Sequence, residues 1–291
     1  MNSTTELFEQ HRPQLFRIAY GMLERVAPAK DIVQEAYLRW QDQDIDNIKS
    51  PHAYLSKIVS RLCLDELKSA KSRREQYIGP DLPEPVLTSE SGNPTEHVEL
   101  TETLSMALLV VLEQLTPVQR AVFLLREVFD YDYASIASVV DKSEAHCRKI
   151  AQRARDQVHE QRPYFEKDIP KQNELITSFF EAVQTGDISE VKDLLKKEAT
   201  LYSDGGGKVT AARKPIYGDD KIARFMLGIQ KKAPEDLHIE FQDVNGEPGA
   251  VVYIGDELYN VWSFHTEGEV ISNIFVVLNP EKLEHIEHES L

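Results

Sequence analysis

Cysteine is scarce in this sequence: Cys63 and Cys147 are the only two among 291 residues, and they lack metal-site spacing. Both fall among apolar positions at helical spacing, so we expect reduced core residues of a cytoplasmic protein. Long apolar runs are lacking too, since the longest, Met106–Leu112, is far too short to span a bilayer. The first residues form neither a basic nor an apolar segment, which predicts no secretory signal. We therefore expect no metal, no cofactor and no membrane partner.

Positive charge is also in deficit, with 33 Lys and Arg against 49 Asp and Glu and a net charge of −16. The excess acid is confined to two segments. Residues 79–102 carry six acidic residues and no basic one, and residues 164–291 carry 24 acidic against 13 basic. Residues 1–78 and 103–163 are nearly balanced. Nucleic-acid contact is therefore permitted in those two segments and disfavoured elsewhere.

The stretch from Thr116 to Val158 predicts three short helices, with Thr116 capping the first and Ser143 the last. The second helix is expected to carry Tyr133, Ile136, Ala137 and Val140 on one face. A short helix, a tight turn and a basic helix are typical of the helix-turn-helix, whose second helix enters the major groove. The expected DNA contacts are Lys142, Ser143, His146, Arg148, Lys149, Gln152 and Arg153. The alternative is a solvated helix of an ordinary three-helix bundle.

Residues 6–78 predict an all-helical domain with two polar surfaces. The helix Asp31–Trp40 carries one of them opposite its apolar positions, made of Asp31, Gln34, Glu35 and Arg39. Ser50-Pro51 predicts the start of a long helix. Its cations fall along one face: Lys57, Arg61, Lys68, Lys71, Arg73 and Arg74. Such a stripe is usually a solvated face, but the excess of cations here favours a surface that follows phosphates.

Together these pieces resemble the bacterial extracytoplasmic-function sigma factors. The resemblance rests on Asp31–Arg39, the run Leu62–Glu75 and the helix-turn-helix, in that order, and covers roughly the first 160 residues. It implies that Asp31, Gln34, Glu35 and Arg39 meet the clamp of core RNA polymerase. It also implies that the basic helix lies along melting DNA at the −10 promoter element, and that the helix-turn-helix binds the −35 element. Pockets for flipped bases are expected around Asn47–Tyr54.

Residues 164–291 predict an α+β domain, with helices followed by an antiparallel meander. The expected helices are Glu174–Val183, Ile188–Leu195 and Asp219–Gln230. The expected strands are Thr200–Ser203, Leu237–Val244, Ala250–Ile254, Leu258–His265 and Val270–Leu278. This pattern resembles the cone-shaped SnoaL-like domain that is fused to one subgroup of these sigma factors.

Three short motifs support that subgroup, and the resemblance implies that they join the domains for regulation. They are Leu82, Pro83, Glu84 and Pro85 in the acidic linker; Asp204, Gly205, Gly206, Gly207 and Lys208; and Asn279, Pro280, Lys282 and Leu283. The subgroup usually has Trp where this chain has Asp81, and Asp where it has Glu281. We expect the linker to be a flexible tether that docks through its prolines, with Lys208 pairing with Glu84.

Two rival functions stay open at this point. One is a one-component DNA-binding regulator whose third domain senses a small ligand, and the other is a cyclase or isomerase carrying a DNA-binding module. The loop Asp204–Lys208 has glycines that suit a bound phosphate but lacks the spacing of a nucleotide P-loop. His265, Asp204, Asp256 and Tyr259 are candidates to line a pocket in the cone.

The polymerase-facing set on Asp31–Trp40 favours a sigma factor over the one-component regulator, which has no use for it. A pocket with convergent acid and base groups would instead favour the cyclase or isomerase. We therefore expect a non-enzymatic protein that binds core RNA polymerase and promoter DNA. Its expected domains are all-α segments at 1–78 and 103–163, joined by the linker 79–102, and an α+β SnoaL-like domain at 164–291.

Overall fold

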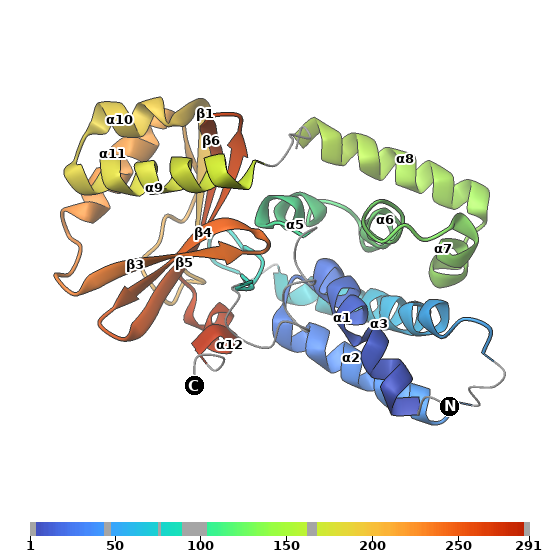
Figure 1. Cartoon of the computed structure of the whole chain (residues 1–291). Helices are drawn as coiled ribbons and strands as arrows, with labels where there is room; N and C mark the ends of the chain where they lie inside the picture. The colour runs from blue at the N-terminus through green and yellow to red at the C-terminus, as the bar shows by residue number, and fades with distance from the viewer. Residues whose placement is uncertain (1–3, 44–47, 75–76, 89–103, 162–167, 288–291) are drawn as a thin grey trace. The chain divides into compact units, whose positions relative to one another are not determined.

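The computed structural model describes residues 4–43, 48–74, 77–88, 104–161 and 168–287 (Figure 1). These residues belong to two units. The first contains residues 4–74, 104 and 108–161, and the second contains residues 77–88, 105–107 and 168–287. Within the described ranges, no helix is long and apolar enough to cross a membrane.

The first unit begins with three packed helices. They are α1 (Thr4–Leu23), α2 (Val26–Gln41) and α3 (Pro51–Arg74). Trp40 of α2 is fully buried, and its indole N–H donates to the backbone carbonyl of Thr4 at 2.9 Å. Ser50 caps α3 as expected, because its hydroxyl accepts from the N–H of Ala53 at 3.3 Å.

The rest of this unit is a run of short helices that ends in a long one. They are α5 (Met106–Leu112), whose first two residues belong to the second unit, α6 (Pro117–Phe123), a π-helical turn (Leu124–Val128), α7 (Tyr133–Val140) and α8 (Glu144–Gln161). The predicted capping box at Thr116 is present. Asp141 ends α7 in the left-handed conformation, with φ of 51°. On the expected face of α7, Ile136 is buried and Tyr133, Ala137 and Val140 are half-buried, and Val139 is buried as well.

The second unit is an α+β domain with a six-stranded sheet. Its helices are α9 (Ile169–Thr185), α10 (Ile188–Asp193), α11 (Asp219–Gln230) and the terminal α12 (Glu284–Glu287). Its strands are β1 (Leu195–Asp204), β2 (Ile216–Tyr217), β3 (Leu237–Val244), β4 (Glu247–Ile254), β5 (Glu257–Glu267) and β6 (Val270–Val277). The order is β2-β1-β6-β5-β4-β3. The expected antiparallel meander is correct for β3 to β6, but β1 pairs with β6 in parallel.

Helices α9, α10 and α11 share one apolar core with the sheet (Figure 1). Aromatic rings fill its centre: Phe180 lies 5.5 Å from Trp262 and 5.9 Å from Phe264, measured between ring centroids. Successive residues of a strand point to opposite faces of the sheet, so Val251 and Val261 point to the face away from this core. Both are buried as well. Both faces of the central sheet are therefore covered.

Candidate functional site

The segment 77–88 of the linker packs against the sheet domain. Residues 82–86 are five consecutive buried residues, and Leu87 forms an antiparallel bridge with Val244 at the end of β3. The backbone N–H of Val86 donates to Asn245 Oδ1 at 3.1 Å, and the N–H of Asn245 donates back to the Val86 carbonyl at 2.8 Å. We expected a flexible tether, but this part of the linker is held by paired backbone groups.

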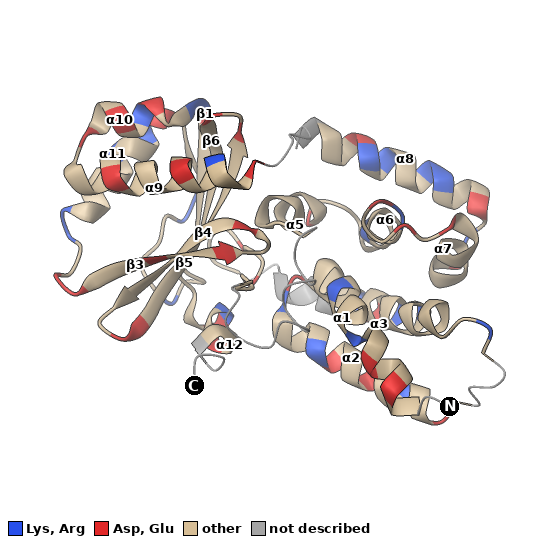
Figure 2. Cartoon of the chain, viewed as in Figure 1, with Lys and Arg blue, Asp and Glu red and all other residues tan. Residues whose placement is uncertain are grey.

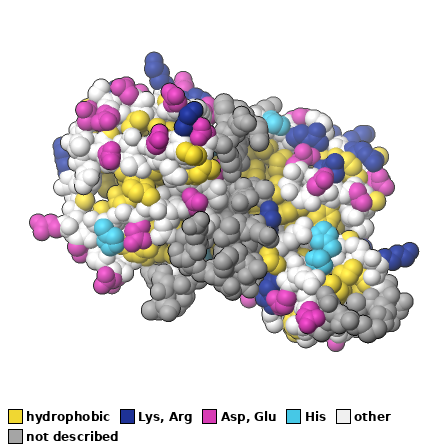
Figure 3. All heavy atoms as spheres, in the orientation of Figure 1, with side chains coloured by type: hydrophobic (Ala, Val, Ile, Leu, Met, Phe, Trp, Pro, Cys, Tyr) yellow, Lys and Arg dark blue, Asp and Glu magenta, His cyan; other side chains and the backbone are white. Residues whose placement is uncertain are grey.

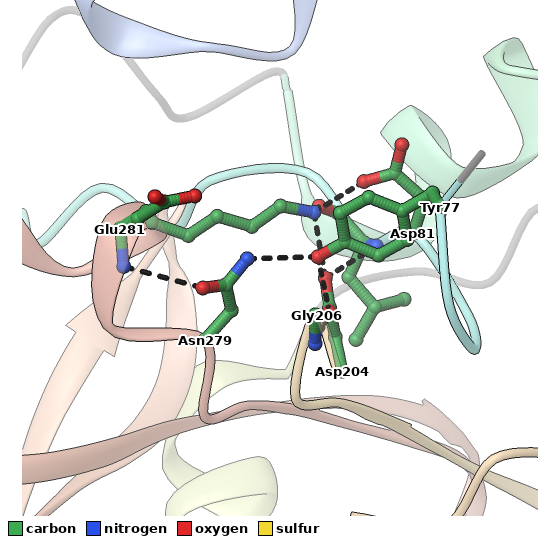
Figure 4. Close-up of polar contacts among 8 residues, drawn as sticks. Tyr77, Asp81, Asp204, Gly206, Asn279 and Glu281 are labelled. Atoms are coloured by element: carbon green, nitrogen blue, oxygen red, sulfur yellow. Dashed lines mark hydrogen bonds and ion pairs between the residues drawn. The ribbon is translucent and has the colours of Figure 1, made fainter. Parts of the chain in front are cut away.

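Asp204, at the end of β1, is the centre of the contact with the linker (Figure 4). Its carboxylate accepts from the Tyr77 hydroxyl at 2.6 Å and from the backbone N–H of Leu82 at 2.9 Å. It also accepts from the N–H of Gly206 at 3.0 Å and from Lys282 Nζ at 2.6 Å. The carboxylate is fully buried, so these donors replace its lost hydration.

Lys282 is the cation that balances this carboxylate, and its side chain is fully buried as well. Its ammonium group contacts Asp81 and the Leu82 carbonyl in addition to Asp204. The same group lies 4.8 Å from the centroid of the Tyr77 ring, a cation–π contact. Three of its four partners come from the linker, so the buried ammonium group depends on the docked linker for most of its favourable contacts.

Tyr77 ties the linker to the third motif as well. Asn279 Nδ2 donates to the Tyr77 hydroxyl at 2.9 Å. Burial, with the Asp204 carboxylate accepting its proton, holds the pKa of Tyr77 far above its usual value. The hydroxyl therefore stays a donor to Asp204 throughout the physiological range. Figure 4 shows these side chains converging from the linker, the end of β1 and the segment after β6.

The glycine loop and its lysine differ from the expected arrangement. Gly206 has φ of +58°, and a Cβ there would collide with the amide of Asn279, so glycine is required. Lys208 forms its ion pair with Glu281, an exposed contact, rather than with Glu84 as we predicted. The lysine that holds the linker is Lys282.

Helix α8 presents a polar, basic face beside a buried stripe. The stripe is Cys147, Ile150, Ala151, Ala154 and Val158. It leaves exposed all five predicted contacts of this helix, His146, Arg148, Lys149, Gln152 and Arg153. Lys142 is half-buried and Ser143 exposed in the turn before it. Figures 2 and 3 show the cations gathered along this helix.

Two of these side chains are restrained by neighbours. Arg148 pairs with Glu144 at 2.8 Å and lies 4.9 Å from the Tyr133 ring centroid. Gln152 donates to Asp156 at 2.7 Å. Such exposed pairs are weak, so both side chains are available to another partner.

The predicted polymerase face of α2 is solvent-facing. Asp31, Gln34 and Arg39 are exposed and Glu35 is half-buried, with Arg39 Nε 2.8 Å from Glu35 Oε1. Leu38 is half exposed on this surface, one turn beyond Gln34, and sequence reasoning did not select it.

Arg61 of α3 is not free to follow DNA in this structure. Its guanidinium donates to the Ser138 carbonyl at 2.7 Å, to the Val139 carbonyl at 3.3 Å and to Asp141 at 2.6 Å. These acceptors form the C-terminus of α7, where a cation is favoured. The predicted DNA contact therefore joins α3 to α7.

A second polar contact joins α3 to the turn before α7. The Tyr131 hydroxyl contacts the Ser56 hydroxyl and lies 2.9 Å from His52 Nε2, which is 2.7 Å from Gln14 Oε1. Burial raises the pKa of Tyr131 to about 12. Burial also lowers the pKa of His52, so the neutral imidazole is favoured.

Arg120 of α6 makes a third contact of this kind and is almost fully buried. Its guanidinium donates to the Met22 carbonyl at 2.8 Å and the Leu112 carbonyl at 3.0 Å, and lies 2.8 Å from Glu24. An arginine inside a helical pattern predicts a surface cation, so no signal in the sequence marked this residue.

The comparisons with known proteins agree on one family. Residues 7–73 match Sigma-70 region 2, and residues 105–158 match Sigma-70 region 4. The ECF RNA polymerase sigma factor SigJ of Mycobacterium tuberculosis (strain ATCC 25618 / H37Rv) is 40% identical over 247 residues, which cover 84% of this chain and 79% of the relative. The chain is an ECF RNA polymerase sigma factor. The sigma-factor domains imply core RNA polymerase and promoter DNA as its partners.

Two further similarities extend this result to the C-terminal domain. The crystal structure of the M. tuberculosis extracytoplasmic function sigma factor SigJ superposes with a TM-score of 0.78 at 34% identity, covering 95% of this sigma factor and 97% of that chain. The probable ECF RNA polymerase sigma factor SigI of M. tuberculosis (strain CDC 1551 / Oshkosh) is 29% identical over 282 residues, 94% of this chain and 92% of the relative. The predicted fold, two helical sigma domains followed by an α+β SnoaL-like domain, is confirmed.

The remaining predicted DNA contacts of the sigma factor lie on α3 or beside it. Lys57 is half-buried, and Lys68 is exposed and pairs with Asp65 at 2.9 Å. The side chains of Lys71, Arg73 and Arg74, and residue Asn47 of the expected base pocket, lie outside the described residues.

The candidates for a catalytic pocket do not converge. The Asp204 carboxylate accepts hydrogen bonds from the linker, and Tyr259 is 40% exposed. Asp256 lies in the turn before β5, nine residues from His265, or about 30 Å along an extended strand. These four residues therefore do not form one site.

Proposed function

We propose that the SnoaL-like domain controls promoter use by this sigma factor through its hold on the linker between regions 2 and 4. The carrying observation is the buried Lys282–Asp204 pair, which is completed by Tyr77, Asp81 and Leu82 of the linker. Docking fixes the linker residues that immediately follow region 2. Docking would thereby limit how far regions 2 and 4 can separate.

The surfaces that act on the polymerase and the promoter are those on α2, α3 and α8. We assign the polymerase clamp to Asp31, Gln34, Glu35 and Arg39, which form an exposed polar face unneeded for packing. We assign the −35 element to α8, where Arg and Gln side chains can read base edges in the major groove. The cations of α3 suit the backbone of the −10 region. This activity places the protein with the polymerase and chromosome in the cytoplasm.

We infer that the SnoaL-like domain has a regulatory rather than a catalytic role. Sigma factors as a family catalyse no reaction. The centre of the fold is filled by Phe179, Phe180, Trp262 and Phe264, and the candidate acid and base groups are dispersed. Fold alone transfers no chemistry.

The proposal is tested by transcription in vitro with core RNA polymerase and the promoter of the protein's own gene. Four proteins are compared: the intact chain, Tyr77→Phe, Lys282→Met and a chain ending before Asn279. We expect each altered protein to change promoter-directed transcription while its affinity for core polymerase stays constant. Lys208→Met is the matched control, because it removes a lysine whose ion pair is exposed. Equal transcription from all four would reject the regulatory role.

A further inference from the structure

A hollow of about 260 Å³ lies beside the glycine loop in the second unit. Ile78 and Gly79 of the linker line it together with Gly205 and Gly207 of the loop. A Cβ at Gly207 would meet the Ile78 side chain at 3.0 Å, so glycine lets the linker approach. The volume is just below the range of about 300–1,000 Å³ that is typical of sites for drug-sized ligands, so it suits a smaller molecule.

The charge of the hollow is opposite to that of the surrounding domain. Residues 164–291 have 24 acidic and 13 basic residues, yet the charged side chains that line the hollow are Lys208 and Arg213. Among the described residues Lys208 pairs with Glu281, and this exposed pair costs little to exchange. Arg213 is exposed and makes no ion pair with any described residue. An anion would therefore meet two available cations.

Ser203 places a hydroxyl group at the hollow. It lines the hollow from the end of β1 and is only 5% exposed. Its hydroxyl has no hydrogen-bond partner among the described residues. The oxygen is not among the fully buried unpartnered side-chain atoms of the described residues, so it is reached from the hollow and can bond to a molecule there.

The loop after Lys208 adds backbone donors. In the described part of the chain, no carbonyl accepts from the N–H groups of residues 210–213. The hydroxyl of Thr210 also lines the hollow. Residues 210–213 line the hollow, so these N–H groups are candidate donors to an anion, and a phosphate accepts several such bonds at once.

We propose that this hollow binds a small phosphate-bearing molecule, with Arg213, Lys208 and Ser203 holding the phosphate group. A phosphate carries a charge of about −1.5 to −2, which two cations balance better than the single charge of a carboxylate would. Because Ile78 and Gly79 form one wall, the bound molecule would stabilise the docked linker. That consequence rests on the regulatory role proposed above, whereas the binding itself does not.

Calorimetric titration of the full chain with glycerol 3-phosphate tests the binding, with inorganic phosphate, acetate and uncharged glycerol as parallel titrants. We expect saturable binding of the two phosphates and none of glycerol. Arg213→Glu should weaken it at least about tenfold, since a charge-assisted hydrogen bond is lost and repulsion is added. Ser203→Ala should weaken it less. Lys232→Glu, an exposed lysine outside the hollow, makes the same charge change and should leave binding intact.

Three results would overturn the site: no saturable binding of either phosphate, equal binding of acetate, or equal weakening by Arg213→Glu and Lys232→Glu. The regulatory consequence has its own readout. Hydrogen exchange of the Leu82 and Val86 amides should slow when glycerol 3-phosphate is added. If binding is measured but exchange stays the same, the site stands and its coupling to the linker is rejected.

Discussion

Replacing Lys282 by Met removes one buried charge while keeping a side chain of similar length. Asp204 is then a fully buried acidic group without its cation. Breaking a buried pair in this way costs about 3–5 kcal/mol, because the remaining charge is uncompensated. The domain can avoid much of this cost by releasing the linker, since water can then reach Asp204. We therefore expect the linker to undock before the SnoaL-like domain unfolds.

Hydrogen exchange reports this undocking directly, because three linker amides are held by the domain. Leu82 donates to Asp204, Val86 to Asn245 and Thr88 to the Asp243 carbonyl. If about 3 kcal/mol of docking is lost, exchange at these amides should quicken by about 100-fold or more. Amides inside β5 and β6 should keep their protection, because they belong to the sheet itself.

Two further variants decide whether the charge is the cause. Lys208→Met removes an exposed ion pair worth at most about 1 kcal/mol. The exchange rates of the three linker amides should therefore change less than about fivefold in this variant. The double variant Asp204→Asn with Lys282→Met removes both charges and should recover part of the protection. If Lys282→Met exchanges no faster than Lys208→Met, the buried cation does not hold the linker and the reasoning fails.

The other predictions concern the first unit. Asp31→Lys with Glu35→Lys should weaken binding to core polymerase with an unchanged circular dichroism spectrum, and unaltered affinity would remove the α2 assignment. Arg148→Ala should cost about 1–3 kcal/mol at one promoter position if it reads a base, whereas Lys149→Ala should weaken all sequences alike; promoter-titration assays separate the two. Burial lowers the pKa of His52, so its stabilising effect is present above about pH 6.5 and is lost as pH falls through the folded-state value. Below about pH 6.5 the melting temperature of the unaltered chain should therefore fall more steeply with pH than that of the His52→Gln variant. Parallel curves of melting temperature against pH would contradict this.

Local signals in the sequence were enough for much of the fold. The capping box at Thr116 and the Ser143 cap each depend on residues within a few positions of one another. The alternation along β3 likewise identifies a strand without any knowledge of its partner. The parallel pairing of β1 with β6 was missed, because the two strands are separated by about 65 residues of intervening chain.

Charged side chains were the harder problem. Arginine and lysine usually lie at the surface. Arg61, Arg120 and Lys282 nevertheless each donate hydrogen bonds to groups far away in the sequence. Whether a cation is buried depends on which carbonyls and carboxylates surround it, and that is a property of tertiary structure. The motif Asn279–Leu283 was found by resemblance, but the choice of Lys282 over Lys208 as the linker's partner required the structure.

The position of Arg61 bears on how this sigma factor reaches a promoter. The −10 and −35 elements are about 25 base pairs apart by their names, or roughly 85 Å along B-form DNA. The longest element of the first unit, the 24-residue α3, spans only about 36 Å. Regions 2 and 4 are joined there by Arg61, Tyr131 and Arg120. One guanidinium cannot hold the C-terminus of α7 and a phosphate at the same time. On the proposed assignments we expect binding of both elements to break these contacts, and we expect the hold of the SnoaL-like domain on residues 77–88 to limit how far regions 2 and 4 then move apart.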